Sequence, residues 1–293
     1  MKARDLFYRS SGSLRAPWQW IGFLLITLSV SLLTAALVAP YALRVLSQAA
    51  LSFWSLLAGL IVAHVVMVRL VDHGTWAPIG LARRQAAPSR LAVGLAAGSL
   101  GILAPSGVLL AAHWLGGEPA TAPYSWIHYA ASWVAFFLPQ SLAEEMLSRG
   151  YLFARTRDAI GWKGALAITS VGFGLLHMAN PGATPESIAI VIIAGGFLGG
   201  ILLLTDSLYA AWMAHFAWNW SMAALLHAPV SGLPANPPDY RMVDHGPAWL
   251  TGGGWGPEGG VAAALGMAVC MIVLVAWYRR SPRAAPFFRS RDD

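Results

Sequence analysis

The sequence has little charge and almost no cysteine. Only 11% of the 293 residues are Asp, Glu, Lys or Arg, whereas 57% are hydrophobic. Soluble globular domains carry about 25% charged residues, so this composition excludes a soluble fold and also a disordered chain. Cys270 is the single cysteine, which excludes an internal disulfide and a thiolate metal cluster. The composition predicts a helical membrane protein.

Acidic residues are especially scarce, with 13 Asp and Glu against 19 Lys and Arg, which gives a formal net charge of +6. Nucleic-acid binding would require basic residues gathered on a solvated face. In a chain with so few charges, the preference of Lys and Arg for cytoplasmic membrane loops explains the excess better. We therefore expect no nucleic-acid partner.

Continuous apolar runs of about 20 residues, the length of a membrane helix, recur along the chain. They are rich in Leu, Ala and Gly and lack the alternation of barrel strands. The expected fold class is an all-α, polytopic integral membrane protein with about eight transmembrane helices. The predicted spans are Trp18–Ala39, Ala50–Val71, Leu91–Trp114, one starting near Ile127, Gly164–Met178, Ser187–Thr205, Ser207–Leu226 and Gly260–Tyr278.

The distribution of basic residues predicts the orientation of these spans. With the N-terminus inside, 17 of the 19 Lys and Arg residues fall on the inner side, and only Arg44 and Arg241 lie outside. This asymmetry follows the positive-inside rule and predicts that both termini are cytoplasmic. The longest outer loop, Ala228–Gly259, is rich in Pro and Gly, and a lid and a disordered segment are both open readings of it.

Two adjacent glutamates occur in the region of the fourth span, where ionisable residues are costly and indicate function. Neighbouring helical residues point about 100° apart, so Glu144 and Glu145 face different directions. Glu145 has Arg149 four residues later, the favourable order for an ion pair. Glu144 instead has Ser148 at that position and shares a polar stripe with Gln140. The alternative is that both glutamates sit at a solvated helix end in the cytoplasmic interface.

Further polar residues fall at a similar predicted depth on two other helices. At 1.5 Å per residue, Glu144 and His177 each lie roughly 20 Å from the inner surface. His215 lies roughly 14 Å and Asn219 roughly 20 Å from it, and their i, i+4 spacing places both on one helix face. These depths are compatible with one shared site within the bilayer.

Such a group of side chains has the parts needed to hydrolyse an amide. A buried carboxylate can deprotonate a water, and a histidine can hold that water or transfer its proton. A further histidine and an asparagine can donate hydrogen bonds to the developing oxyanion. Glu144, His177 and His215 could instead be zinc ligands with one position left for water. The sequence has no His-Glu-x-x-His pair, the usual local signature of such a zinc site.

These three elements together resemble those of the CAAX-protease and bacteriocin-processing family of intramembrane proteases, which includes the Ras-converting endopeptidases and the Abi proteins. The family pattern is Glu-Glu-x-x-x-Arg on one helix, Phe-x-x-x-His on the next and His-x-x-x-Asn or Asp on a later one. This sequence contains all three in that order: Glu144-Glu145 with Arg149, Phe173 with His177, and His215 with Asn219. The first three spans and the last span match the family only in being membrane helices.

The resemblance implies a role for each motif residue. Glu144 would activate the attacking water with help from His177, and His215 and Asn219 would stabilise the oxyanion. Glu145 and Arg149 would support the site. The resemblance also implies a glutamic peptidase that needs no metal, and zinc bound by the three candidate ligands remains the alternative.

The resemblance also suggests an organisation and a setting for the protein. We expect a single membrane domain over 1–293, with a catalytic core at about 127–226 and peripheral spans over 18–114 and 260–278. The substrate would be a membrane-associated peptide or protein: a prenylated CAAX tail, a leader or a C-terminal sorting segment. The expected location is the plasma (inner) membrane of a bacterium, where the lipid bilayer is the other partner.

Two other classes of function compete with the peptidase. Intramembrane Glu, His and Asn also form relays in ion-coupled carriers, but the sequence shows neither an inverted repeat nor paired broken helices. A non-catalytic scaffold or bacteriocin-immunity protein of the same fold would tolerate loss of the motif residues, yet all four are present. His64, alone in the second span, is expected to be a packed, hydrogen-bonded histidine with no catalytic role.

Overall fold

The structure is a computed structural model that describes residues 14–44 and 46–280. It is mostly helical, at 76%. Six basic residues used in the orientation argument, at positions 2, 4, 9, 283, 289 and 291, lie outside the described residues. The cytoplasmic location of both termini therefore stays a prediction.

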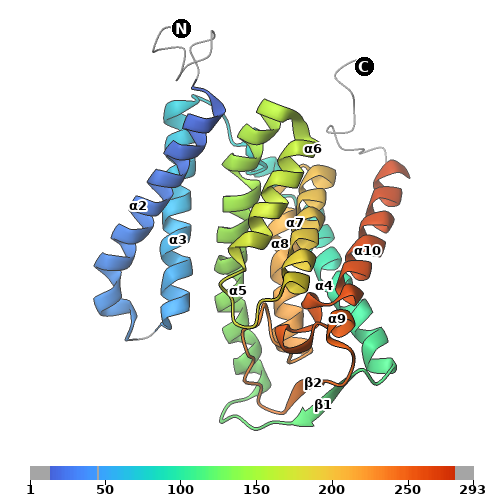
Figure 1. Cartoon of the computed structure of the whole chain (residues 1–293). Helices are drawn as coiled ribbons and strands as arrows, with labels where there is room; N and C mark the ends of the chain where they lie inside the picture. Colours follow the sequence, from blue (N-terminus) through green and yellow to red (C-terminus); the bar gives the residue numbers. More distant parts are fainter. Residues whose placement is uncertain (1–13, 45, 281–293) are drawn as a thin grey trace. The chain divides into compact units, whose positions relative to one another are not determined.

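The α-helices and strands follow one another along the chain as α2 Ala16–Ala42, α3 Gln48–Val65, α4 Pro88–Ala111, β1 Leu115–Pro119, α5 Trp126–Arg149, α6 Tyr151–Leu176, α7 Pro185–Thr205, α8 Leu208–Trp220, β2 Tyr240–Asp244, α9 Ala248–Thr251 and α10 Val261–Arg280 (Figure 1). Short π and 3-10 turns lie between them: η1 Val66–Val71, η2 Ala77–Ile79, η3 Arg83–Ala86, η4 Ser221–Leu225, η5 Gly253–Trp255 and η6 Pro257–Gly259.

Six helical segments are long and apolar enough to cross a membrane, which makes the chain a multi-pass membrane protein by helix length and composition. Five of them coincide with predicted spans to within three residues at each end. The sixth, Trp126–Leu176, contains both α5 and α6 and so corresponds to the predicted fourth and fifth spans.

The predicted seventh span is not among these six helical segments. Its helix α8 has only 13 residues, and none of them is exposed. The count of eight spans stays a prediction.

The chain divides into two compact units. One unit comprises the described residues up to Ala82 together with Pro139–Thr169, and the other comprises Arg83–Leu138 together with the described residues from Ser170 onward. Helices α5 and α6 each contribute to both units. The residues Glu144, Glu145 and Arg149 belong to the first unit, and His177, His215 and Asn219 belong to the second.

In the first unit, the helix that carries the glutamates continues beyond Arg149. Backbone hydrogen bonds run through Gly150, whose N–H donates to Met146 and whose carbonyl accepts from Ala154. Within α6, the backbone is non-helical at Gly161, where φ is 81° and ψ is 166°. A left-handed φ of this kind favours glycine, so Gly161 allows the chain to turn within α6 (Figure 1).

Helices α2 and α3 lie side by side in the first unit, and a buried histidine contributes to its packing (Figure 1). His64 is 1% exposed, its Nδ1 donates to the Leu60 carbonyl at 2.7 Å, and its Nε2 accepts from the Tyr151 N–H at 3.2 Å. Both ring nitrogens are therefore bonded to the backbone, which confirms the structural role expected for this residue. A Cβ atom at Gly150 would overlap His64 Nε2, so the close approach requires glycine there.

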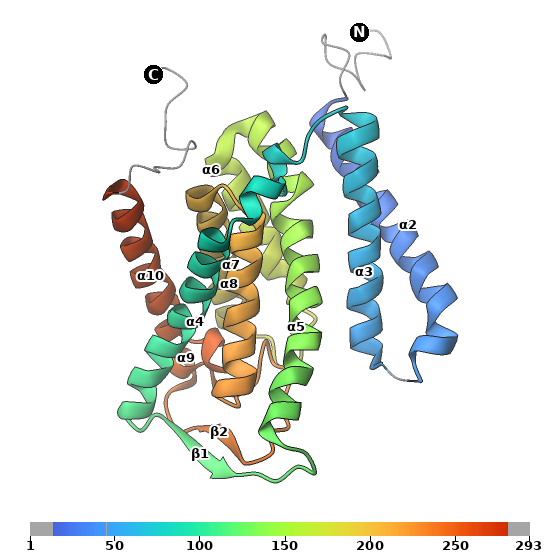
Figure 2. The ribbon, with the colours of Figure 1, turned by 180° about the vertical axis from the view of Figure 1, so that it is seen from behind.

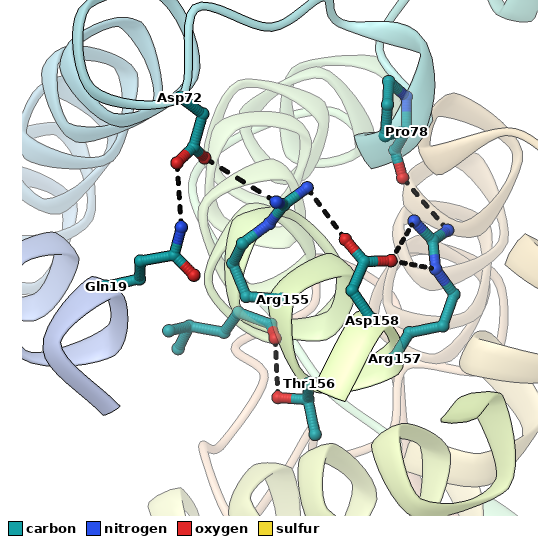
Figure 3. A network of polar contacts seen from close by, with 8 residues as sticks. Gln19, Asp72, Pro78, Arg155, Thr156, Arg157 and Asp158 are labelled. Carbon is teal, nitrogen blue, oxygen red and sulfur yellow. Dashed lines mark hydrogen bonds and ion pairs between the residues drawn. The ribbon is translucent and has the colours of Figure 1, made fainter. Parts of the chain in front are cut away.

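A polar network joins α2, the residue after η1 and α6 within the first unit (Figure 3). Asp72 accepts a 2.8 Å hydrogen bond from Gln19 Nε2 and lies 3.9 Å from Arg155 Nη1. Arg155 also pairs with Asp158 at 3.1 Å, and Arg157 contacts the same carboxylate at 3.1 Å. Each charged side chain of this network therefore contacts an oppositely charged side chain of the same unit.

In the second unit, helices α4 and α8 make the closest helix contact, and glycine makes it possible (Figure 2). Cβ atoms added at Gly94 and Gly98 would overlap the carbonyl oxygens of Ala210 and Ala214. Small residues four apart allow membrane helices to approach to backbone contact. The Gly94 and Gly98 pair thereby brings α4 against the helix that carries His215.

We expect Gly98→Ala to destabilise the protein by about 1–3 kcal/mol, because the added methyl group overpacks a backbone contact. Gly107→Ala in the same helix is the matched control, since a Cβ there meets no atom within 4 Å. The measurement is the thermal unfolding midpoint in detergent. Equal midpoints for the two variants would contradict the proposed close packing.

The loop 228–259 contributes one strand to a two-stranded sheet. Its strand β2 pairs with β1 in an antiparallel sheet, with Leu115 opposite Asp244 and Pro119 opposite Tyr240. The apolar runs predicted an all-α fold, and these two short strands depart from that prediction. Both belong to connections that the basic-residue count assigned to the outer side, so the pairing agrees with that topology.

Candidate functional site

The polar stripe predicted on the fourth span is present on α5 in the first unit. Gln140 Nε2 donates a short hydrogen bond to Glu144 Oε1, and Ser141 Oγ donates to Gln140 Oε1 at 3.2 Å. Glu144 is half-buried. A neutral amide one turn earlier therefore orients this carboxylate.

Glu145 and Arg149 form the predicted ion pair one turn apart. Arg149 Nη1 lies 3.0 Å from Glu145 Oε1, and both side chains are buried, at 1% and 0% exposed. A buried charge requires a partner, because desolvation costs several kcal/mol per ion. The pair ties two successive turns of the helix that carries Glu144.

We expect Glu145→Ala to lower the free energy of unfolding by about 3–5 kcal/mol, because it removes a carboxylate 3.0 Å from a buried guanidinium. The double substitution Glu145→Leu with Arg149→Met should recover much of this loss. Thermal unfolding in detergent measures both effects, with Glu118→Gln, an exposed acid on β1, as the control. A single variant as stable as this control would contradict the importance of the pair.

The other three predicted catalytic residues line one cavity within the second unit. His177, His215 and Asn219 all border a cavity of about 30 Å³, which is room for a water-sized molecule. The rest of the lining is largely apolar and includes Phe173, Val191, Phe197, Leu198, Trp218 and Met267. The cavity thus combines a few hydrogen-bonding side chains with an apolar wall, the usual composition of a small-molecule or side-chain pocket.

His177 lies in the turn directly after α6, one residue beyond the helix end, and not inside a helix reaching Met178 as expected. Its Nδ1 bonds the Phe173 carbonyl at 2.8 Å. A carbonyl oxygen only accepts, so Nδ1 carries the proton, and Nε2 is the basic nitrogen of the neutral ring. This tautomer suits a histidine that takes a proton from water.

His215 and Asn219 occupy successive turns of α8, as predicted, and are 6% and 5% exposed. The Phe173 ring packs edge-on against His215, with 5.7 Å between ring centroids. Both polar side chains can donate hydrogen bonds toward the cavity from a rigid helix. Donors held in this way are suited to stabilising negative charge on an oxygen atom.

One carboxylate at the cavity was not anticipated from the sequence. Glu258, in the 3-10 turn η6, lines the same cavity and is 8% exposed. It accepts hydrogen bonds from Trp218 Nε1 and Ser231 Oγ, each at 2.8 Å. Glu258 lies in a Pro- and Gly-rich loop without helical periodicity. Its only sequence signal was that it is the last acid before the final span.

Among the described residues, no three His, Cys, Asp or Glu side chains are grouped so that they could hold a metal ion. The roles of Glu144, His177 and His215, as catalytic groups or as zinc ligands, remain predictions.

A comparison with protein families finds a match over residues 125–221, to the family described as Rce1-like, type II CAAX prenyl endopeptidase Rce1-like. The matched segment contains all three motifs and agrees with the resemblance that they indicated. The comparisons with curated proteins and with solved structures give no match.

Proposed function

We propose, from the family match over residues 125–221, that the protein is an intramembrane endopeptidase. It hydrolyses a peptide bond of a membrane-associated protein or peptide. The observation that carries the proposal is that His177, His215 and Asn219, which come from two of the three motifs, line one cavity in the second unit. A water-sized cavity that carries hydrogen-bonding groups is suited to holding a water molecule and to polarising a carbonyl placed beside it.

In the proposed mechanism, Glu144 is the general base and His177 assists it. The water loses a proton to the carboxylate and its oxygen attacks the substrate carbonyl carbon. His215 and Asn219 donate hydrogen bonds to the resulting oxyanion. When the C–N bond breaks, the proton held by Glu144 passes to the leaving nitrogen, so the products are a carboxylic acid and an amine, and Glu144 is again a carboxylate. Glu145 and Arg149 keep the helix of Glu144 in place.

The apolar wall of the cavity favours a substrate with an apolar side chain or a lipid group next to the scissile bond. A prenylated CAAX tail, a leader and a C-terminal sorting segment all meet this requirement. We propose that the enzyme acts in the plasma (inner) membrane of a bacterium, as a single membrane domain with its catalytic core at about 127–226.

Replacing the proposed base or its partner should abolish catalysis. We expect Glu144→Ala and His177→Ala to lower kcat by about 100-fold or more, since general acid–base groups contribute at least that factor. The probe is a farnesylated, internally quenched peptide ending in a CAAX sequence, incubated with the purified protein in detergent.

Glu118→Gln is the control in this experiment and should cleave like the wild type, and unchanged unfolding midpoints would show that the variants are folded. Wild-type activity in Glu144→Ala would disprove the assignment. A wild-type protein that binds the probe without cleaving it would favour a scaffold or immunity protein.

Chelation separates the two chemistries proposed for these residues. A glutamic peptidase should keep its activity in EDTA and in 1,10-phenanthroline, because a carboxylate and a histidine activate the water. A zinc enzyme should lose it and recover on addition of Zn²⁺, because the metal lowers the pKa of its bound water. Loss followed by zinc-dependent recovery would replace the glutamic mechanism.

A further inference from the structure

Glu258 is a buried carboxylate at the proposed active-site cavity that the proposed mechanism does not use. It lies in the loop 228–259, outside the segment that matches the family, and none of the three motifs includes it. It nevertheless lines the same cavity as His177, His215 and Asn219. A buried ionisable residue that lines a cavity is a candidate functional residue.

Three donors converge on the Glu258 carboxylate. Trp218 Nε1 donates to Oε2 at 2.8 Å, while Ser231 donates to Oε1 through its hydroxyl at 2.8 Å and through its backbone N–H at 2.5 Å. Hydrogen bonds to an ionised acceptor are roughly twice as strong as neutral ones. Only a carboxylate offers acceptors on both sides, because the amide group of glutamine would turn an N–H toward one of the donors.

The first of these donors belongs to the helix that carries two proposed catalytic residues. Trp218 lies on α8 three residues after His215 and directly before Asn219. All three side chains line the cavity, so they share one face of the helix. The bond from Glu258 to the indole therefore restrains the rotation of that face about the helix axis.

The second donor connects Glu258 to the segment of His177. The Ser231 carbonyl accepts a 3.1 Å hydrogen bond from Asn180 Nδ2. The Asn180 backbone N–H in turn donates to the His177 carbonyl at 3.0 Å. Glu258 is thus connected to α8 through Trp218. It is connected to the turn of His177 through Ser231 and Asn180.

We propose that Glu258 is a positioning residue that fastens the loop 228–259 to α8 and to the turn after α6, and thereby orients His215, Asn219 and His177 around the cavity. This inference rests on the proposed peptidase function. The outer loop then holds α8 and the turn after α6 in a fixed relative position, because the Glu258 carboxylate accepts hydrogen bonds from Trp218 and from Ser231.

A double-substitution experiment tests the contact with the indole. We expect Glu258→Gln to lower kcat for the farnesylated CAAX peptide about tenfold, because one buried donor loses its acceptor, while KM changes less than about twofold. Trp218→Phe removes the opposing N–H, so the combination of both substitutions should be no slower than Trp218→Phe alone. Losses that simply multiply would contradict the proposed contact.

Ser231→Ala is a milder second variant that keeps the backbone donor. It should reduce kcat by about two- to fivefold, since it removes one hydroxyl bond. Glu118→Gln is the matched control and should leave both kinetic parameters unchanged. If Glu258→Gln does not fold, a wild-type kcat in Ser231→Ala overturns the proposal and a reduced kcat supports it.

Hydrogen exchange of the full chain in detergent tests the fastening without any substrate. Glu258→Gln should increase amide exchange about tenfold in peptides covering 228–236 and 253–260, and Gly107→Ala, whose added Cβ on α4 meets no atom within 4 Å, should not. Wild-type exchange, or faster exchange with an unchanged kcat, overturns the positioning role. If the wild type does not cleave the peptide, the proposed function fails, and the positioning role fails with it. Faster exchange in Glu258→Gln would in that case still support the contact between Glu258 and its donors.

Discussion

A carboxylate in an apolar helix has no water to solvate it and must find hydrogen-bond donors within the protein. The polar parts of this structure follow from that constraint. On α5, Glu145 pairs with Arg149 and Glu144 accepts from Gln140. On the outer loop, Glu258 gathers three donors. Each acid is therefore held by specific neighbours, and the backbone segments that carry those neighbours are held with it.

The same constraint explains why the proposed chemistry needs a built cavity. Hydrolysis requires water at a peptide bond, and an apolar interior does not supply it. The cavity in the second unit provides two histidines, an asparagine, Ser231 and Glu258 on a wall whose other residues are apolar. The bond from His177 Nδ1 to a backbone carbonyl leaves Nε2 as the basic nitrogen, which is the form that can take part in proton transfer.

Glycine contributes to this arrangement through its lack of a side chain. Gly98 permits α4 to contact the backbone of α8, and Gly150 permits His64 to bond the Tyr151 N–H beneath the glutamate helix. In a membrane, where apolar surfaces gain little from association, such close contacts supply much of the packing energy. The helices that carry the motif residues are therefore located by small residues elsewhere in the chain.

Several features could be predicted from the sequence because they depend on residues that are neighbours along one helix. The apolar spans follow from composition, the Glu145–Arg149 pair follows from i, i+4 spacing, and the shared face of His215 and Asn219 follows in the same way. The helix of His177 was predicted to reach Met178, and it ends two residues earlier, at Leu176. The predicted seventh span, Ser207–Leu226, corresponds to α8 and the π turn η4 that follows it directly, and its crossing of the membrane stays a prediction.

The sequence by itself determined the membrane class, most of the spans and the three motifs, because local periodicity and hydrophobicity carry that information. The tertiary structure decided which loop residues reach the cavity. Glu258 meets Trp218 across 40 residues and Ser231 across 27, and β1 meets β2 across more than a hundred. Contacts of this separation leave no periodic trace in the chain, since they depend on how the helices between them pack.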